Sequence, residues 1–344
     1  MAWGESLASG LRGGRSRAAR TASTCEDPAA VEGKQELRVL LGVTASGKSA
    51  LALELAERAG AEVVSMDSML VYRGMDIGTA KPTAAERARV RHHGLDLAAP
   101  SEVFTVQHWL AATEAALADS AARGRRALLV GGTAFYYKAL VHGLFEGPDV
   151  DPALRASLER RYELEGAAAL HAELARVDVA AAARIHANDR KRVVRALEVW
   201  HQSGRPLSDW QREWGWDGSG ASERPRRVVE LAPEPARLEQ RIVERTGAML
   251  DAGWAAEAAG VRAGGGFSAT ASQALGYAIA LDLHDGRISR REAAEQIALA
   301  TRQFARRQRT WFRKFREARV VATPETPQDL AERVDEVLRW FDWA

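Results

Sequence analysis

The chain has 344 residues, 46% hydrophobic and 27% charged, which is an ordinary composition for a globular protein large enough for more than one core. It contains no apolar run of 18 residues, so we expect no membrane span. The single cysteine, Cys25, excludes an internal disulfide framework and a multi-cysteine metal site, and a cytoplasmic location fits best.

The formal net charge is only +2, but the arginines are unevenly placed. They are concentrated between residues 184 and 227 and again between residues 302 and 316. Local basic surfaces on a nearly neutral protein favour a polyanionic partner. Solvated helix faces explain the same pattern equally well, so charge alone does not identify a partner.

The first 36 residues are rich in Gly, Ser, Ala and Arg and lack hydrophobic periodicity. This composition predicts a disordered N-terminal extension over 1–36. The segment has no apolar core of the kind found in secretory signals. An organellar transit peptide is a weaker alternative, because acidic residues occur later in the segment.

Strands and helices then alternate along the chain. A buried strand over 37–43 is followed by a glycine-containing loop and a helix that runs to about Ala59. A second strand over 61–68, an amphipathic helix over 104–125 and a third strand over 126–133 continue the alternation. Elements of these lengths in this order predict an α/β fold built from parallel βαβ units.

The pattern changes near residue 143, where the sequence becomes almost wholly helical. We predict a helical insertion domain over 143–221. A strand over 226–233 then returns to the sheet and is followed by long helices. The α/β core therefore comprises residues 37–142 and 222–344.

The loop after the first strand fits the pattern G-x-x-x-x-G-K-[ST], with Gly42, Gly47, Lys48 and Ser49 at its fixed positions. The glycines let backbone N–H groups surround phosphate oxygens, the lysine neutralises their charge, and the serine hydroxyl can bind Mg²⁺. Its place between a strand and a helix makes a chance match improbable. The core is therefore P-loop NTPase-like and holds a di- or triphosphate.

An NTPase usually also carries an aspartate at the end of another apolar strand, which holds Mg²⁺. Here the third strand ends in Gly131, Gly132 and Thr133, without an acid. The only carboxylate at a strand end is Asp67. This arrangement weakens the interpretation as an ordinary ATPase, although a small-molecule kinase stays possible.

Seven motifs, the first of which belongs to the phosphate loop, occur in one order along the chain: "TASGKS" (44–49), "DSMLVYRGMDIGTAKP" (67–82), "HHGLDL" (92–97), "VGGTAFYYKAL" (130–140), "NDRKRVVRALEV" (188–199), "ALGY" (274–277) and "TRQFARRQRTWFR" (301–313). Together they closely resemble the tRNA dimethylallyltransferases, also called tRNA isopentenyltransferases. The resemblance covers nearly the whole chain after about residue 37. The sequence departs from the commoner pattern at Val43, Leu70, Phe135 and Arg306, and none of these changes removes a reactive group.

The resemblance implies a reaction and its substrates. Enzymes of this family transfer a dimethylallyl group from dimethylallyl diphosphate to N6 of the adenosine immediately 3′ of the anticodon, in tRNAs that read codons beginning with U. It also implies an Mg²⁺ cofactor, a P-loop α/β core with a helical insertion that grips the anticodon stem-loop, and a monomer.

The family motif places Asp67 as the general base for the adenine amine, and helix capping or second-shell Mg²⁺ binding is the alternative role. Thr44, Lys48 and Arg245 would stabilise the departing diphosphate, with turn formation and a solvated arginine pair as the plainer alternatives. Ser49 is the expected metal ligand. The full diphosphate-binding prediction comprises Gly42, Val43, Thr44, Ala45, Ser46, Gly47, Lys48, Ser49, Arg241 and Arg245.

Recognition of tRNA should combine phosphate contacts with extraction of the target base. The residues that the resemblance implies are Asp67, Ser68, Met69, Leu70, Thr133, Arg155, Lys191, Arg192, Val193, Val194, Arg195, Gln273, Ala274, Gly276 and Tyr277. Leu70 stands where glutamine is frequent, so backbone atoms would have to replace one contact to the base. In the basic C-terminal motif, Trp311 and Phe312 are expected to be core residues rather than stacking platforms.

Three rival functions remain. An isopentenyltransferase that acts on free adenine nucleotides would share the phosphate loop, but it needs neither the insertion nor the basic C-terminal motif. A P-loop kinase predicts ATP turnover. An RNA-binding protein with a relict nucleotide site is disfavoured because Lys48, Ser49 and Asp67 are all present.

Overall fold

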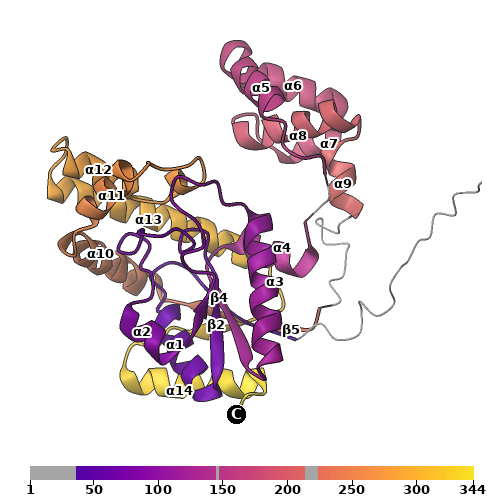
Figure 1. The fold of residues 1–344 in the computed structure, drawn as a ribbon. Helices are drawn as coiled ribbons and strands as arrows, with labels where there is room; N and C mark the ends of the chain where they lie inside the picture. Colours follow the sequence, from indigo (N-terminus) through magenta and orange to yellow (C-terminus); the bar gives the residue numbers. More distant parts are fainter. Residues whose placement is uncertain (1–35, 145–146, 214–223) are drawn as a thin grey trace, which may run out of the picture. The chain divides into compact units, whose positions relative to one another are not determined.

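The computed structural model describes residues 36–144, 147–213 and 224–344. Residues 1–35 of the predicted N-terminal extension and the last part of the predicted insertion, 214–221, lie outside the described residues. The described helices and strands alternate through the core as expected (Figure 1). None of these helices combines the length and the apolar character that a membrane crossing requires.

The core is a six-stranded sheet with the strand order β3-β2-β4-β1-β5-β6, in which every neighbouring pair is parallel. Because all the strands run in one direction, their carboxyl ends meet along one edge, where α/β proteins bind their ligands. The strands are β1 (Leu37–Gly42), β2 (Ala61–Met66), β3 (His92–His93), β4 (Arg126–Gly131), β5 (Arg226–Ala232) and β6 (Ala318–Ala322).

Helices cover both faces of the sheet, as the continuous burial of β1, β2 and most of β4 requires. One face packs Leu51 and Leu55 of α1 with Val337 and Phe341 of α14. The other packs α3, α4 and part of α13 around Trp109. The helices of these layers are α1 (Lys48–Ala59), α3 (Val106–Ala122), α4 (Ala134–His142), α13 (Arg290–Phe312) and α14 (Pro327–Phe341).

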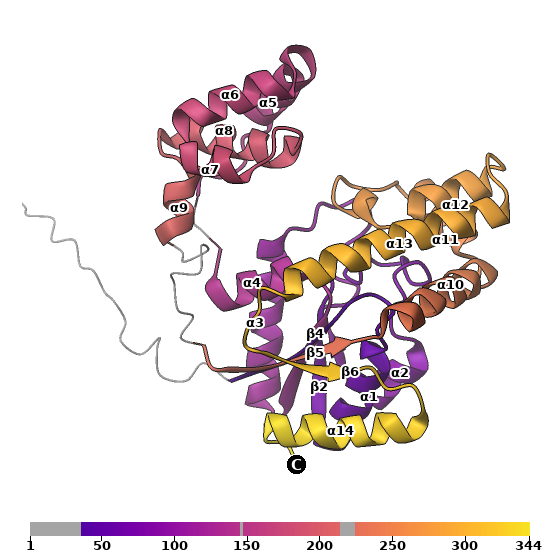
Figure 2. The same cartoon turned by 180° about the vertical axis from the view of Figure 1, so that it is seen from behind.

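A third group of helices extends the carboxyl edge of the sheet. Helix α13 contacts α10 and α12, and α11 contacts α12 (Figure 2). Their shared core includes Trp254, Tyr277 and Ile297, together with Val71, Tyr72 and Met75 from the segment after β2. The bounds are α10 (Pro235–Asp251), α11 (Trp254–Ala263), the short η2 (Ala271–Gln273) and α12 (Tyr277–His284), while α2 (Ala84–Arg89) follows the β2 segment.

The predicted insertion is helical throughout its described part. Its helices share a hydrophobic cluster that contains no residue of the sheet and includes Leu158, Leu170 and Leu197. The helices are α5 (Pro152–Glu165), α6 (Ala167–Val177), α7 (Val179–Arg184), α8 (Arg190–Ser203) and α9 (Leu207–Glu213).

Two strands were absent from the sequence-based expectation. The segment after β5 was expected to contain only helices, but β6 follows α13 and pairs with β5. It is an edge strand of five residues, most of them exposed or half-buried, so it lacks the buried apolar run that marks the inner strands. The other missed strand, β3, has only two residues.

Candidate active site

The phosphate loop connects Gly42, the last residue of β1, to Lys48, the first residue of α1. Gly47 has a φ of 83° and Ala45 a φ of 60°, so the loop passes twice through the left-handed region. A Cβ on Gly42 would lie 2.5 Å from the Ser46 hydroxyl oxygen, so any larger residue there requires the buried Ser46 side chain to move. The tight loop brings the N-terminus of α1 to the sheet edge, where its backbone N–H groups favour an anion.

A cavity of about 650 Å³ opens beside this loop. It is bounded by the carboxyl ends of β1, β2 and β4 and by helices α10 and α13. Most of the residues predicted to act at the diphosphate or at the target base line it, although they are distant in sequence: Thr44, Ala45, Lys48, Ser49, Asp67, Ser68, Met69, Leu70, Thr133, Arg245, Gln273, Ala274, Gly276 and Tyr277. The cavity thus joins an anion-binding loop to a strand-end carboxylate.

Three charged groups in the cavity influence one another. Burial, opposed by the negative charge of Asp67 and reinforced by the positive charge of Arg245, lowers the pKa of the Lys48 ammonium to about 8. Burial also lowers the pKa of the Arg245 guanidinium, and Asp67 opposes that shift. Two partly desolvated cations beside one carboxylate form a site with a surplus of positive charge, which suits an anionic ligand.

Asp67 follows β2 directly and begins a turn. Its Oδ1 accepts the N–H of Met69 at 2.8 Å, while Oδ2 has no hydrogen-bond partner among the described residues. The N–H of Ser68 donates to the Thr133 hydroxyl at 3.3 Å, which links the ends of β2 and β4. One carboxylate oxygen therefore fixes the local backbone, and the other can accept a proton from a ligand in the cavity.

The loop contains two contacts that reduce its freedom. The Lys48 ammonium donates to the Val43 carbonyl at 3.4 Å. The N–H of Thr44 donates to the side chain of Gln308 at 2.9 Å. Gln308 lies within the basic C-terminal motif, but nothing local in a helical glutamine indicates a partner 264 residues away.

A second cavity, of about 1220 Å³, lies on the other side of the phosphate loop and is lined by Gly47, Lys48, Ser49 and Arg241 among others. Arg241 donates to the Pro324 carbonyl at 2.9 Å and pairs with Glu325 at 3.2 Å. A Cβ on Gly47 would lie 3.1 Å from the Arg241 guanidinium. Arg241 thus lies against the loop, but a carboxylate already neutralises part of its charge.

The segment 273–277 packs tightly against α11. A Cβ on Gly276 would lie 2.3 Å from the Trp254 ring, and the φ of Gly276 is 89°. The Tyr277 hydroxyl donates to Glu257 at 2.7 Å, and both Ala274 and Tyr277 are buried. Tyr277 therefore builds the wall of the cavity, and the exposed Gln273 presents polar atoms at its opening.

The predicted tRNA contacts of the insertion fall into two groups. Lys191 and Arg192 are exposed on α8. Val193 and Val194 are 0% and 2% exposed and belong to the core of the insertion. This burial corrects the prediction that their side chains contact tRNA. The helical turn directs both valine side chains inward.

Arg155 and Arg195 are held by a common partner. Arg155 donates to the fully buried Glu198 at 2.6 Å, and Arg195 donates to it at 2.8 Å. Two guanidinium groups on one buried carboxylate keep a net positive charge at the surface of the insertion. Both side chains therefore have a structural role that sequence reasoning did not foresee.

The aromatic residues of the C-terminal motif are core residues, as predicted. Phe312 is 1% exposed, and the partly buried Trp311 packs against the same cluster. The Lys314 ammonium lies 4.8 Å from the centre of the Trp311 ring.

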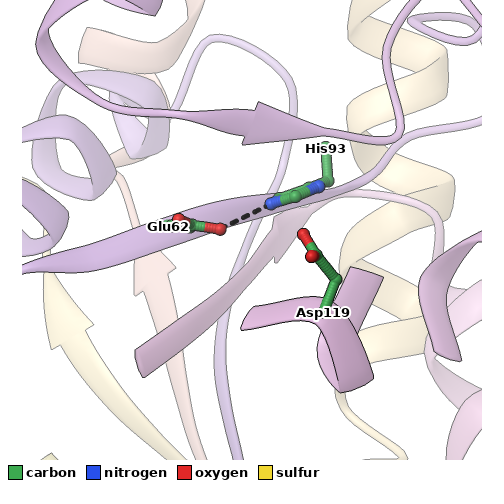
Figure 3. Close-up of side chains that lie close together, drawn as sticks. All are labelled: Glu62, His93 and Asp119. Atoms are coloured by element: carbon green, nitrogen blue, oxygen red, sulfur yellow. Dashed lines mark hydrogen bonds and ion pairs between the residues drawn. The ribbon is translucent and has the colours of Figure 1, made fainter. Parts of the chain in front are cut away.

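Figure 3 shows the one group of His and acidic side chains in the described chain whose ligand atoms lie close enough to hold a metal, namely Glu62, His93 and Asp119. Glu62 accepts from His93 at 2.7 Å and is paired with Arg123, which holds the pKa of the Glu62 carboxyl well below its usual range. The guanidinium supplies the positive charge that a cation would bring. Glu62 also lies near the amino end of β2, whereas Asp67 follows its carboxyl end, so we assign the group to packing.

Comparisons with known proteins identify relatives over most of the chain. A family model described as IPP transferase matches residues 70–315, and one described as isopentenyl transferase matches residues 35–99. A tRNA dimethylallyltransferase of Methylococcus capsulatus is 48% identical over 81% of this chain and 90% of its own. That of Anaeromyxobacter dehalogenans is 44% identical over 87% of this chain and 99% of its own.

Solved structures show the same likeness. A tRNA isopentenylpyrophosphate transferase of Bacillus halodurans, 33% identical, aligns with a TM-score of 0.64 over 90% of this chain and 97% of its own. A eukaryotic dimethylallyltransferase acting on tRNA is 22% identical and aligns with a TM-score of 0.72 over 90% of this chain and 80% of its own, which shows a common fold. The family model matches most of the chain, and the two relatives align along nearly all of their own length. The chain therefore belongs to the IPP transferase family.

Proposed function

We propose that this protein transfers the dimethylallyl group of dimethylallyl diphosphate to N6 of the adenosine immediately 3′ of the anticodon, in tRNAs that read codons beginning with U. The observation that carries the proposal is the single cavity in which the phosphate loop faces the strand-end carboxylate Asp67. The 44–48% identical relatives named tRNA dimethylallyltransferase support the same reaction.

The diphosphate binds at the phosphate loop. Lys48 and Arg245 neutralise its charge, and the backbone N–H groups at the start of α1 donate to its oxygens. As the bond between the allylic carbon and the diphosphate oxygen breaks, negative charge grows on that oxygen. Cations that are already desolvated stabilise this charge without reorganising, which lowers the barrier to transfer.

The target adenine enters the other part of the cavity, beside Asp67. Its exocyclic amine is a weak nucleophile, because the lone pair is delocalised into the ring. The nitrogen attacks the allylic carbon, a new N–C bond forms, and the amine proton passes to Oδ2 of Asp67. The products are N6-dimethylallyladenosine and diphosphate.

Mg²⁺ fits the residues at the loop. The Ser49 hydroxyl is exposed beside Lys48, and a hydroxyl together with diphosphate oxygens and water is a ligand set that Mg²⁺ prefers. When bound, Mg²⁺ would add positive charge to the leaving diphosphate. Apart from the Arg123-paired cluster, the described chain offers no other group of three His, Cys, Asp or Glu ligands.

The tRNA is held outside the cavity by its backbone. Lys191 and Arg192 on the insertion present exposed cations, and Arg306, Arg307 and Arg309 extend along α13. We propose that the protein acts in the cytoplasm. We also propose that it is a monomer, since one chain supplies the phosphate loop, the carboxylate and the basic surfaces.

A label-transfer assay tests this function. Purified protein, Mg²⁺ and dimethylallyl diphosphate labelled in the allyl group are mixed with an unmodified tRNA or with AMP. We expect label on the tRNA, and loss of that label when the adenosine 3′ of the anticodon is changed to guanosine. Label on AMP alone would assign the protein to free nucleotides, and consumption of ATP without transfer would indicate a kinase.

A further inference from the structure

A single buried side chain joins the phosphate loop to the end of a neighbouring strand. Gln308 of α13 is 6% exposed. Its Oε1 accepts the N–H of Thr44 at 2.9 Å, and its Nε2 donates to the Gly132 carbonyl at 2.8 Å. These contacts span 264 and 176 residues of sequence, and we call them the Gln308 bridge.

A side-chain amide suits the bridge. Thr44 offers a donor and Gly132 an acceptor, and the amide of Gln308 presents an acceptor and a donor on one planar group. The fit at Gly132 is also close, because a Cβ there would lie 2.3 Å from Nε2 of Gln308. A glycine is therefore needed at 132 to let the amide reach the backbone.

The bridge lies between the two halves of the reaction site. Thr44 is in the phosphate loop after β1, and Gly132 follows β4, the strand between β1 and β2. The next residue, Thr133, accepts the N–H of Ser68, which is adjacent to Asp67. A short path of hydrogen bonds and adjacent residues thus runs from the phosphate loop through Gln308 to the backbone beside Asp67.

We propose that Gln308 is a positioning residue that sets the distance between the bound diphosphate and Asp67. The proposal rests on the proposed function, because the transfer step requires the bound diphosphate and Asp67 to be correctly placed relative to each other. The allylic carbon must lie between the attacking nitrogen and the leaving oxygen, and a displacement of about 1 Å can slow such a step roughly 100-fold. The Thr44 N–H donates to Gln308, so this N–H group fixes the loop rather than binding an anion.

Two near-isosteric variants separate positioning from folding. Gln308→Met keeps the length of the side chain and removes both hydrogen bonds, and Gln308→Glu keeps the acceptor for Thr44 but places an oxygen against the Gly132 carbonyl. We expect kcat to fall roughly 10- to 100-fold in each, with little change in KM for tRNA or in the affinity for dimethylallyl diphosphate. Gln296→Glu, at an exposed position of the same helix, is the matched control and should keep full activity.

A double-mutant cycle tests whether the effect arises at the contact with Gly132. Gly132→Ala introduces a methyl group into the position of the Gln308 amide, and we expect it to lower kcat as well. Gln308→Ala removes the contact at 2.3 Å and leaves the Gly42 carbonyl oxygen at 3.2 Å, so Gly132→Ala should cost less in that background than in the wild type. Equal costs in both backgrounds, or unchanged kcat in Gln308→Met, would overturn the proposal.

Hydrogen exchange provides a measurement that does not depend on activity. The Thr44 amide should exchange slowly in the wild type and faster in Gln308→Met, whereas amides of α14 should be unaffected. If the wild type transfers no label to tRNA, the proposed function fails and the exchange rates still judge the bridge. If transfer occurs but the Thr44 amide exchanges equally in both proteins, the bridge fails and the function stands.

Discussion

At the scale of single residues, the two carboxylate oxygens of Asp67 have different roles, one in the local turn and one in the proposed reaction. Oδ1 holds the Met69 N–H, and Oδ2 faces no partner among the described residues. Asp67→Asn keeps an acceptor for the turn but removes the base, so kcat should fall roughly 10²- to 10⁴-fold while tRNA still binds. Transfer rates and tRNA binding by filter retention are the measurements. An active Asn variant beside an inactive Ala variant would show that the turn, not the base, is what the reaction needs.

Lys48 makes diphosphate binding depend on pH. Its pKa is lowered to about 8 in the free protein, and a bound diphosphate raises it again by its negative charge. Below pH 8 the ammonium is already protonated, so binding takes up no proton. As the pH rises through 8, binding must protonate Lys48, and Kd should increase by up to about tenfold per pH unit.

Calorimetry at pH 9 in buffers of different ionisation enthalpy measures this proton uptake directly. The phosphate groups are fully ionised at that pH and contribute nothing. Lys48→Arg is the control, because a guanidinium keeps its proton. A pH-independent Kd in the wild type between pH 7 and 9 would contradict the assignment.

At the scale of elements, Glu257 fastens the segment after β2 to α11. Its carboxylate accepts the N–H groups of Ile77 at 2.7 Å and Gly78 at 3.1 Å, and also that of Asp76, together with the Tyr277 hydroxyl. Glu257→Ala leaves several donors without an acceptor and should lower the free energy of unfolding by about 2–4 kcal/mol. Tyr277→Phe removes one bond only and should cost about 1 kcal/mol.

Urea denaturation followed by tryptophan fluorescence compares these variants. Trp254, which packs against Gly78 and Gly276 in this region, is one of the ten tryptophans that contribute to the signal. Glu257→Gln keeps one acceptor oxygen and replaces the other by an NH2 donor, so its loss of stability should fall between those of Tyr277→Phe and Glu257→Ala. Equal stability of Glu257→Ala and the wild type would show that solvent replaces the carboxylate.

Which parts of the site could be predicted depends on how their partners are spaced in sequence. The phosphate loop was predictable because Gly42, Gly47 and Lys48 are contiguous and each meets a local requirement of the turn or of the ligand. Gln308 and Glu257 were not, since the backbone groups that they bind lie more than 170 residues away and a glutamine or glutamate on a helix is usually a solvated residue. Only the folded chain identifies them.

At the scale of the whole molecule, buried strands were predicted and edge strands were not. β1, β2 and β4 have buried apolar runs because helices cover both faces of the sheet. β6 lies at the edge, and its residues 318–322 show little alternation of apolar and polar side chains and are mostly exposed or half-buried. The change from alternating to helical sequence near residue 143 was predictable, because a separate hydrophobic cluster needs its own helical periodicity.

The same organisation predicts that binding of the two substrates is separable. Among the residues that the structure describes, none between 143 and 224 lines either cavity, and the three clusters around the sheet and α11 contain no residue of α5–α9. Replacing residues 147–221 by a short Gly/Ser linker should therefore leave the affinity for dimethylallyl diphosphate unchanged. Transfer to tRNA should fall with a rise in KM of roughly tenfold or more, because the exposed cations Lys191 and Arg192 are lost.

The matched control is Lys191→Ala with Arg192→Ala in the full chain, which removes only the two charges. It should weaken tRNA binding in a salt-dependent way and leave the diphosphate site unchanged. Circular dichroism and thermal unfolding establish that the shortened chain is folded. If the shortened chain is folded but no longer binds dimethylallyl diphosphate, the insertion completes the cavity. If the shortened chain has the same KM for tRNA as the wild type, tRNA recognition lies wholly on the α/β core.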